Sequence, residues 1–404
     1  MRDLAAAAIV DAIAGAAERW SNADFPARVR ATRAVMERTG YSEPVVDYAL
    51  DRLFESLTGA ALRAAIAGEL GALEALDGFV PRDGRPAVTF RGVNEVTIVS
   101  SDTTIGVAIP PLAYALCAKS HVVVKDRSDG LVAAFVETLA EERRAFAAAV
   151  SVETWDGHDA SGVRERLGAS DVVVAFGGSA ALSAIRAALR PDARFVPFGH
   201  RTSAGYIARE ALAGEEAART IARGAARDAL LYDGEGCLSL HALFVEDGGA
   251  VGFARFMTLL DEALAAAEIE FPSGRRELAA ATVAARDASR FRESLGFGAV
   301  AGGGGHVLLV DPPLDAVAAL VPRALAAYRA DGPSTAAGFL RRHALPLEGF
   351  ALAAGGRADV LELAVGSGAS QIGPIGMLQS PSLAGEHGGE GRILPFVRAI
   401  TRSQ

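Results

Sequence analysis

The strongest constraint on the fold is a series of short, unbroken apolar runs separated by helical patterns. Valine alone fills positions 122–124 and 172–174, and the runs at 88–90 and 96–99 are also rich in β-branched and aromatic residues. Strands that are apolar on both faces are typical of a parallel sheet covered on both sides. Helical patterns at 111–119 and 131–149 lie between the later runs. The sequence therefore predicts an α/β fold whose βα units could carry a nucleotide.

A second alternation of the same kind follows Cys237. It consists of a strand, a helix at 251–267, a strand at 307–310, a helix near 314–329 and the apolar run 360–365 in the place of a further strand. Residues 1–80 show long Ala- and Leu-rich stretches and are predicted to be helical. We expect two Rossmann-type α/β lobes with an N-terminal helical segment.

Composition excludes several functional classes. The 404 residues carry a net charge of −9, which argues against a nucleic-acid partner. Two cysteines cannot form a disulfide framework, and the histidines lack metal-ligand spacing, so we expect a cytoplasmic protein without a metal. Asp11 interrupts the apolar opening of the chain, so neither a signal peptide nor a membrane span is predicted.

One of the two cysteines stands on a turn of small residues. Cys237 ends the segment Asp233-Gly234-Glu235-Gly236-Cys237 and directly precedes the apolar run of the second alternation. A thiol there is accessible and close to backbone N–H groups, as a nucleophile that forms an acyl intermediate requires. The alternative is a buried structural thiol, which we predict for Cys117 in its apolar helix. His241 lies too far along the strand for a Cys-His dyad.

Two strand ends in the first alternation are candidate cofactor sites. Lys125 closes the run 122–124, and Gly177-Gly178-Ser179 links the run 172–176 to a helix. Ligands bind beyond the carboxyl ends of parallel strands, and a helix N-terminus attracts an anion. Lys125 could instead simply leave the sheet edge, and Ser179 could be a helix cap.

These residues, in this order, resemble the aldehyde dehydrogenase superfamily, and more closely the fatty acyl-CoA reductase family of bacterial bioluminescence. The superfamily has Gln-Gly-Gln-x-Cys where this chain has 233–237, and the reductases have Cys-Leu-Ser-Pro-His where it has 237–241. The block 194–203 is similar to their Phe-Val-Pro-Tyr-Gly-His-Arg-x-Ser, and 372–383 to their ending Ile-Cys-Pro-x-Gly-x-Met-Gln-x-Pro-Pro-Leu. The likeness spans nearly the whole chain.

The resemblance implies an NADP(H)-binding domain at 1–199, a catalytic domain at 200–370 that carries Cys237, and a C-terminal segment at 371–404 that packs back across the lobes. Lys125 would bind the adenosine ribose, and Gly177, Gly178 and Ser179 would lie at the diphosphate. Ser128 stands where NAD-preferring relatives have an acidic residue, and Arg127 is beside it. This favours NADPH over NAD.

For the chemistry, the resemblance implies reduction of an acyl-CoA or acyl-carrier-protein thioester to an aldehyde through a thioester on Cys237. Glu235, two residues before the thiol, and Asp102 are the other candidate catalytic residues. Asp102 replaces the Asn that donates to the oxyanion in the family, and an ionised Asp102 would repel that oxyanion. Pro197 replaces the Glu that activates water in acid-forming dehydrogenases.

Two other functions stay open from the sequence. The chain could be a catalytically silent subunit that binds acyl groups or nucleotides, or an acyl transferase that uses Cys237 without hydride transfer. A homo-oligomer is also left open.

Overall fold

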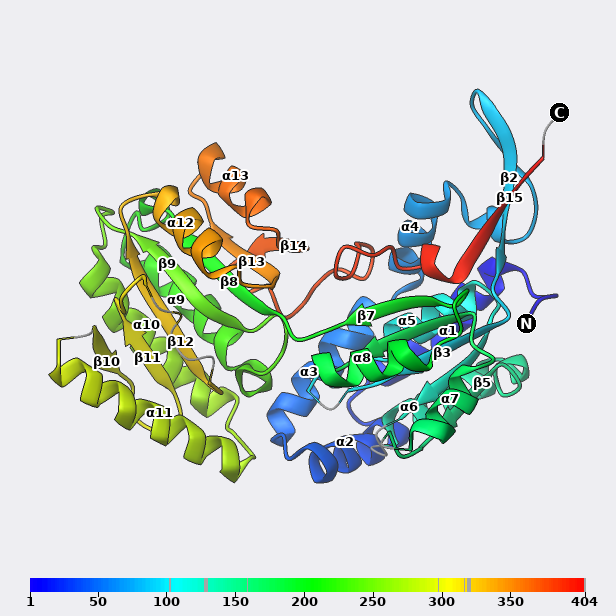
Figure 1. Ribbon diagram of the computed structural model, residues 1–404, viewed down its shortest axis with the longest axis horizontal. Coiled ribbons are helices and arrows are strands. Elements are labelled where there is room, and N and C mark those ends of the chain that lie inside the picture. Colours follow the sequence, from blue (N-terminus) through cyan, green and yellow to red (C-terminus); the bar gives the residue numbers. More distant parts are fainter. Residues whose placement is uncertain are drawn as a thin grey trace. The chain divides into compact units, whose positions relative to one another are not determined.

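The computed structural model describes residues 1–101, 103–126, 130–157, 159–296, 298–315, 317 and 321–402. The chain divides into two compact units. Unit 1 comprises Met1–Thr39, Val46–His200 and Ser382–Gln404, and unit 2 comprises Gly40–Val45 and Arg201–Pro381. Each unit contains its own parallel sheet (Figure 1). In the described part of the chain, no helix has both the length and the apolar character needed to cross a bilayer.

Unit 1 begins with helices and continues as alternating strands and helices. Its elements are α1 (Ala6–Ser21), α2 (Pro26–Thr39), α3 (Glu43–Ser56, whose first turn belongs to unit 2), α4 (Gly59–Leu70), η1 (Leu73–Leu76), β1 (Val80–Arg82), β2 (Arg85–Gly92), β3 (Glu95–Val99), α5 (Ile109–Cys117), β4 (His121–Lys125), α6 (Leu131–Glu142), η2 (Arg144–Phe146), β5 (Val150–Glu153), α7 (Ala160–Leu167), β6 (Val172–Phe176), α8 (Ser179–Ala188), β7 (Arg194–Phe198), η5 (Leu394–Phe396) and β15 (Val397–Arg402).

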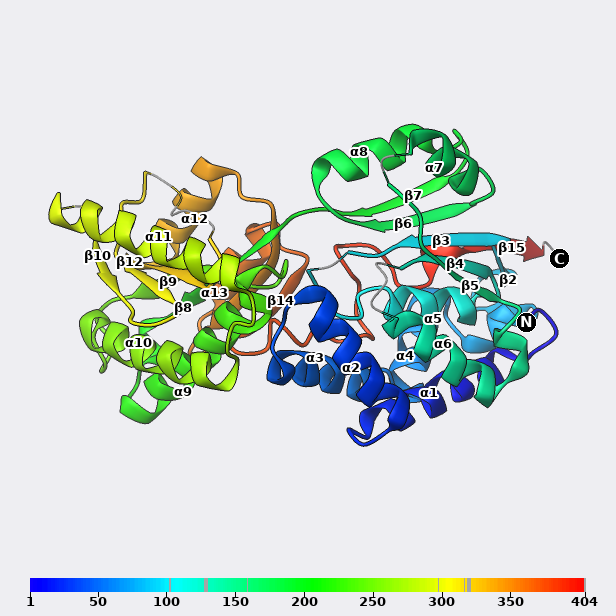
Figure 2. The ribbon, with the colours of Figure 1, turned by 90° about the horizontal axis from the view of Figure 1, so that it is seen from below.

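The main sheet of unit 1 has the order β5-β4-β3-β6-β7, and all its neighbouring strands are parallel. Helices α7 and α8 cover one face, and α5 and α6 cover the other (Figure 2). This double cover explains why the strands are continuously apolar, and all five residues of β6 are buried. The strand order reverses between β3 and β6. Such a reversal opens a crevice beyond the carboxyl ends of the strands, where ligands bind.

A small antiparallel sheet in unit 1 was not anticipated from the sequence. Strand β2 pairs with β1 on one side and with β15 on the other. Asp83 and Gly84 form the two-residue turn between β1 and β2, and Gly84 has φ +64°. Asp-Gly is a favoured hairpin turn because glycine adopts positive φ without a steric penalty.

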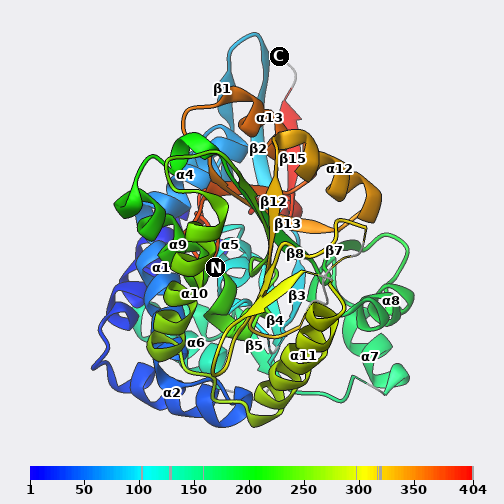
Figure 3. The ribbon, with the colours of Figure 1, turned by 90° about the vertical axis from the view of Figure 1, so that its left-hand side faces the viewer.

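Unit 2 carries a seven-stranded sheet of order β10-β11-β12-β9-β8-β13-β14, in which only β10 is antiparallel to its neighbour. Its elements are β8 (Thr202–Ile207), η3 (Arg209–Ala211), α9 (Glu215–Leu230), η4 (Leu231–Gly234), β9 (Leu240–Glu246), α10 (Phe253–Glu270), α11 (Arg276–Ser294), β10 (Ala299–Ala301), β11 (Val307–Val310), β12 (Ala324–Ala330), α12 (Pro333–His343), β13 (Leu347–Ala353), α13 (Ala358–Gly366) and β14 (Gln371–Pro374). Helices α9 and α10 pack on one face, and α12 and α13 on the other (Figure 3).

Two sequence predictions for unit 2 are wrong. The segment predicted as a helix near 314–329 contains β12, a strand inside the sheet, because burial between two strands overrides the helical propensity of its alanines. The run 360–365 lies in helix α13. Val360, Leu363 and Ala364 are buried there while Leu361 and Val365 are exposed, which is helical spacing in a run too short to reveal it.

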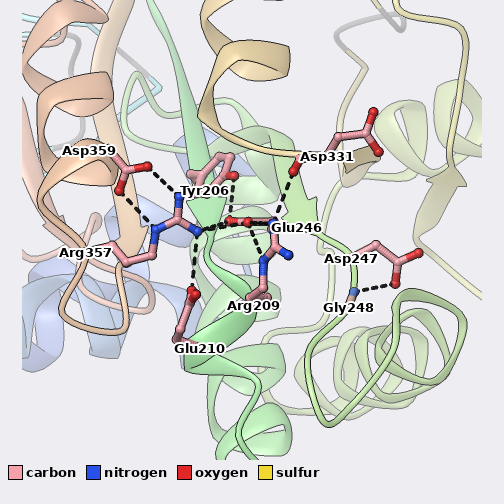
Figure 4. Close-up of polar contacts among 9 residues, drawn as sticks. All are labelled: Tyr206, Arg209, Glu210, Glu246, Asp247, Gly248, Asp331, Arg357 and Asp359. Carbon is pink, nitrogen blue, oxygen red and sulfur yellow. Dashed lines mark hydrogen bonds and ion pairs between the residues drawn. The ribbon is translucent and has the colours of Figure 1, made fainter.

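An ion-pair network closes the carboxyl end of the unit 2 sheet (Figure 4). Glu246, the last residue of β9, has no exposed side-chain surface and accepts hydrogen bonds from Tyr206, Arg209 and Arg357. Although burial opposes ionisation, these donors lower the pKa of Glu246. The network therefore connects β8 and β9 to η3 and to the segment before α13 at this end of the sheet.

Candidate active site

Cys237 lies at the amino end of β9, on a turn with an unusual backbone. Helix α9 ends at Leu230, and the chain then takes positive φ values at Tyr232 (54°), Asp233 (54°) and Gly234 (73°). Only glycine adopts this conformation without cost, so two consecutive non-glycine residues store strain. Strain of this kind persists where surrounding contacts hold it, and those contacts are present here.

A buried ion pair holds the strained turn. Asp233 and Arg323 are each 1% exposed, and the guanidinium Nη1 of Arg323 lies 2.9 Å from the Asp233 carboxylate. The backbone N–H of Arg323 also donates to the carbonyl of Asp233 at 2.9 Å. A second guanidinium, that of Arg275, donates to the same carboxylate at 3.1 Å and stacks on the Tyr41 ring at 4.4 Å. The turn that leads to Cys237 is therefore fixed by charges from distant segments.

Glu235, one of the predicted catalytic residues, lies on this turn. Its carboxylate forms an ion pair with Arg275 at 2.5 Å, and 29% of its side chain is exposed. This contact gives Glu235 a role in holding the turn, while its catalytic role stays a prediction.

The thiol residue itself is held through its main chain. The hydroxyl of Ser203 in β8 donates to the carbonyl of Cys237 at 2.9 Å and accepts the N–H of Gly349 in β13 at 2.9 Å. A side chain at position 349 would meet this hydroxyl at 2.7 Å, so glycine is required there. Sequence reasoning missed both Ser203, which connects Cys237 to β8, and Gly349, which holds the Ser203 hydroxyl from β13.

The strands beside Cys237 lose their regular register at the same level. Glu348 is the extra residue where β13 pairs with β8, and His241 is the extra residue where β9 pairs with β8. Such irregularities re-aim side chains and are frequent next to active sites. The ring nitrogen Nδ1 of His241 donates to the Ser239 carbonyl at 2.8 Å and lies 3.0 Å from the Thr202 hydroxyl. His241 is therefore engaged by these neighbours.

Glu348 is a charged residue that the sequence analysis did not single out. Its side chain is 4% exposed, lies 3.4 Å from Arg201 and accepts a hydrogen bond from Ser370 at 2.7 Å. A lone carboxylate inside the apolar strand 347–353 was the signal that could have identified it. Its negative charge raises the pKa of the Cys237 thiol, after the larger effect of burial.

The two thiols share a raised pKa but differ in access. Burial and then the charge of Glu348 raise the pKa of Cys237 to about 12, although backbone N–H groups and Arg201 oppose the rise. Burial alone raises the pKa of Cys117 to about 12, and Cys117 is 0% exposed in α5, as predicted for a core residue. Cys237, by contrast, is only partly buried. Both thiols are protonated at neutral pH.

Alkylation should display this difference. Iodoacetamide is expected to modify Cys237 slowly at neutral pH, with the rate rising about tenfold per pH unit, because the thiolate fraction grows in that proportion below the pKa. Glu348→Gln should lower the pKa of Cys237 and raise the rate at fixed pH. Peptide mass spectrometry would report both cysteines, with Cys117 unmodified in the folded protein. A rate that levels off near neutral pH would contradict the raised pKa.

The candidate cofactor residues lie at the carboxyl ends of strands in unit 1. Lys125 ends β4, and its ammonium group lies 5.7 Å from the centre of the Trp155 ring. Trp155 lines a pocket of about 530 Å³ together with Asp156, Asp159, Gly162, Glu165 and Arg166. The guanidinium group of Arg166 also lies over this ring, 5.3 Å from its centre, so two cations contact the Trp155 side chain.

The second strand end has the features of an anion site. Gly178 is the N-cap residue of α8 and forms no side-chain cap, and the N–H groups of a first helical turn attract anions. Ser179 is the first helical residue and is exposed rather than the cap. A side chain at position 178 would lie 3.1 Å from the His200 ring, so a larger residue would crowd this approach. Gly177 joins β6 to β7 through its N–H.

Three predicted site residues lie outside the described residues. They are Asp102 after β3, and Arg127 and Ser128 after β4. Their roles at the oxyanion and at the ribose stay predictions.

Comparison with solved structures defines the class of fold. An NAD-dependent benzaldehyde dehydrogenase from Corynebacterium glutamicum is similar with a TM-score of 0.71, at 15% identity over 99% of this chain and 86% of that chain. An NADP-dependent glyceraldehyde-3-phosphate dehydrogenase from Bacillus halodurans C-125, complexed with NADP, gives 0.70 at 13% identity over 99% and 87%. The fold is thus aldehyde dehydrogenase-like, as the sequence resemblance predicted. The model of the acyl-CoA reductase (LuxC) family matches residues 1–302, and the chain belongs to this family.

Two curated relatives match a smaller part of the chain than the solved structures do. A long-chain acyl-protein thioester reductase from Photorhabdus laumondii subsp. laumondii is 22% identical over 244 residues, which are 58% of this chain and 49% of the relative. The protein of the same name from Photorhabdus luminescens is 23% identical over 235 residues, or 56% and 47%. The chain spans about half the length of the curated relatives it matches.

Proposed function

We propose that this protein reduces an acyl thioester to an aldehyde with NADPH, through a covalent thioester on Cys237. The observation that carries the proposal is the setting of Cys237: a half-buried thiol at a strand end, on a turn held by a buried ion pair, with backbone N–H groups beside the sulfur. These are the parts that an acylated nucleophile and its oxyanion need. Membership of the acyl-CoA reductase family supports the same reaction.

The first step transfers the acyl group to the protein. The sulfur of Cys237 bonds to the thioester carbonyl carbon, the bond to the donor's sulfur breaks, and the donor leaves as a thiol. Because Cys237 is protonated at neutral pH, its proton must leave as the bond forms. We assign this proton first to the carboxylate of Glu348, whose charge raises the pKa of the thiol, and then to the departing sulfur, so that the donor leaves as a thiol. The backbone N–H of Cys237 would donate to the oxyanion.

The residues of unit 1 fit a nicotinamide cofactor. The uncapped first turn of α8 would receive the diphosphate, and Lys125 beside the Trp155 pocket would bind the adenosine ribose. NADPH bound there would supply the hydride that converts the thioester to an aldehyde. Pro197 lies in the edge strand β7 and has no titratable group. Without a base at that position, we expect the thioester on Cys237 to hydrolyse slowly.

Binding and turnover measurements on the full chain test this proposal. NADPH should bind with a change in cofactor fluorescence, and NADH more weakly. Acyl-CoAs of several chain lengths should add one acyl group to Cys237, seen by intact mass, and NADPH should then be oxidised as aldehyde forms. Acyl capture without NADPH oxidation would indicate an acyl transferase, and NADPH binding without acyl capture would indicate a silent subunit. Either result would overturn the reductase.

A further inference from the structure

The carboxylate of Asp228 in unit 2 lies where both burial and the helix dipole disfavour a negative charge. Asp228 has no exposed surface and lies in the last turn of α9, where the helix dipole disfavours a negative charge. Burial raises the pKa of Asp228 to about 7, although hydrogen bonds from backbone N–H groups oppose the rise. An unfavourable residue is retained where it serves a specific purpose.

The partners of Asp228 are backbone groups of a single loop. One carboxylate oxygen accepts the N–H of Gly376 at 2.6 Å, and the other accepts the N–H of Leu378 at 3.2 Å. The loop 375–379 lies directly on α9, since a Cβ atom at Gly376 would be 2.8 Å from the Cα of Gly224, one turn earlier in the helix. Asp228 thus fastens this loop to the helix that leads to the Cys237 turn.

The next residue of the loop connects it to the thiol. The side-chain amide of Gln379 donates to the Asp228 carbonyl at 3.2 Å and to the Ser239 hydroxyl at 3.0 Å. The N–H of Ser239 in turn donates to the Gly236 carbonyl at 2.9 Å, which closes the turn around Cys237. A continuous set of hydrogen bonds therefore runs from Asp228 through the loop to the residues on both sides of the thiol.

We infer that Asp228 is a positioning residue for Cys237: it fixes the loop 376–379 so that Gln379 holds Ser239 and, with it, the orientation of the thiol. The inference rests on the proposed function only where it assigns acyl chemistry to Cys237. Displacement of a reacting group by about 1 Å can cost about a hundredfold in rate, so a contact that does not touch the substrate can still matter.

Three variants test the inference: Asp228→Asn, Gln379→Ala and the pair together. Asp228→Asn keeps the size of the side chain but presents an amide N–H to a backbone N–H, which breaks one of the two loop contacts. We expect each single variant to slow acylation of Cys237 by about tenfold or more with little change in KM for the acyl donor. The pair should be no slower than Asp228→Asn alone, because both residues act through one connection. Glu216→Gln, at an exposed position on the same helix, is the matched control.

A merely structural Asp228 predicts a different pattern. In that case Asp228→Asn would lower the unfolding midpoint, and Gln379→Ala would be acylated at the wild-type rate. This outcome would overturn the inference. Iodoacetamide alkylation of Cys237 gives a readout that needs no acyl donor. If the wild type is not acylated at all, the proposed function fails, yet altered alkylation in both single variants still supports the positioning role; unaltered alkylation in both refutes it.

Discussion

Replacing Cys237 with alanine should abolish aldehyde formation from acyl-CoA while leaving NADPH binding unchanged. In the proposed reaction the sulfur forms the bond that carries the acyl group, and loss of a covalent nucleophile commonly costs about 10⁴-fold or more in kcat. The cofactor residues that we propose belong to unit 1, whereas Cys237 belongs to unit 2. NADPH oxidation in the presence of acyl-CoA, together with intact mass, would measure the loss of turnover and of the acyl adduct.

Cys117→Ser is the control for this experiment. Cys117 is enclosed in α5, so its replacement should lower stability through packing but leave an acyl adduct on Cys237. Reduction of acyl-CoA by Cys237→Ala at the wild-type rate would show that the acyl group reaches the hydride without a thioester on this residue.

Replacing Arg323 with methionine should destabilise the protein by about 3–5 kcal/mol. Asp233 is 1% exposed and would keep only Arg275, at 3.1 Å, of its two guanidinium partners, and removal of one partner of a buried pair is strongly destabilising. The positive φ values of the turn would also lose the hydrogen bonds that hold them, so acylation of Cys237 should slow in the fraction that remains folded. Urea unfolding at neutral pH would measure the change.

The double variant Asp233→Asn with Arg323→Met distinguishes the charge from the packing. If the loss comes from the buried carboxylate that Arg323 no longer contacts, the double variant should be more stable than Arg323→Met alone. Arg255→Met removes an exposed ion pair with Glu215 and should leave the unfolding midpoint unchanged. An Arg323→Met protein as stable as the wild type would mean that Arg275 alone compensates Asp233.

The sequence predicted correctly those strands whose own residues show a clear pattern of burial. The runs at 122–124 and 172–174 are central parallel strands, because a strand buried on both faces must be continuously apolar. The hairpin of β1 and β2 carried the signal Asp83-Gly84, which the sequence analysis overlooked. Strand β12 could not be distinguished from a helix, since its alanines favour a helix until neighbouring strands bury them.

The candidate site was predictable only around the thiol. Small residues and the following strand located Cys237, but the groups that hold it come from far along the chain. Arg323 is 90 positions from Asp233, and Gln379 is 140 positions from Ser239. No local pattern relates such residues. Glu348 is different, because a carboxylate in an apolar strand is visible in the sequence even when its partner is not.

The high pKa of Cys237 has a further consequence for the lifetime of the protein. Peroxides and disulfides react with a thiolate and hardly at all with a thiol. Burial and the charge of Glu348 disfavour the thiolate. In the proposed reaction, the raised pKa would keep Cys237 in its reduced form between turnovers, so the burial that slows its acylation would also protect it from oxidative damage.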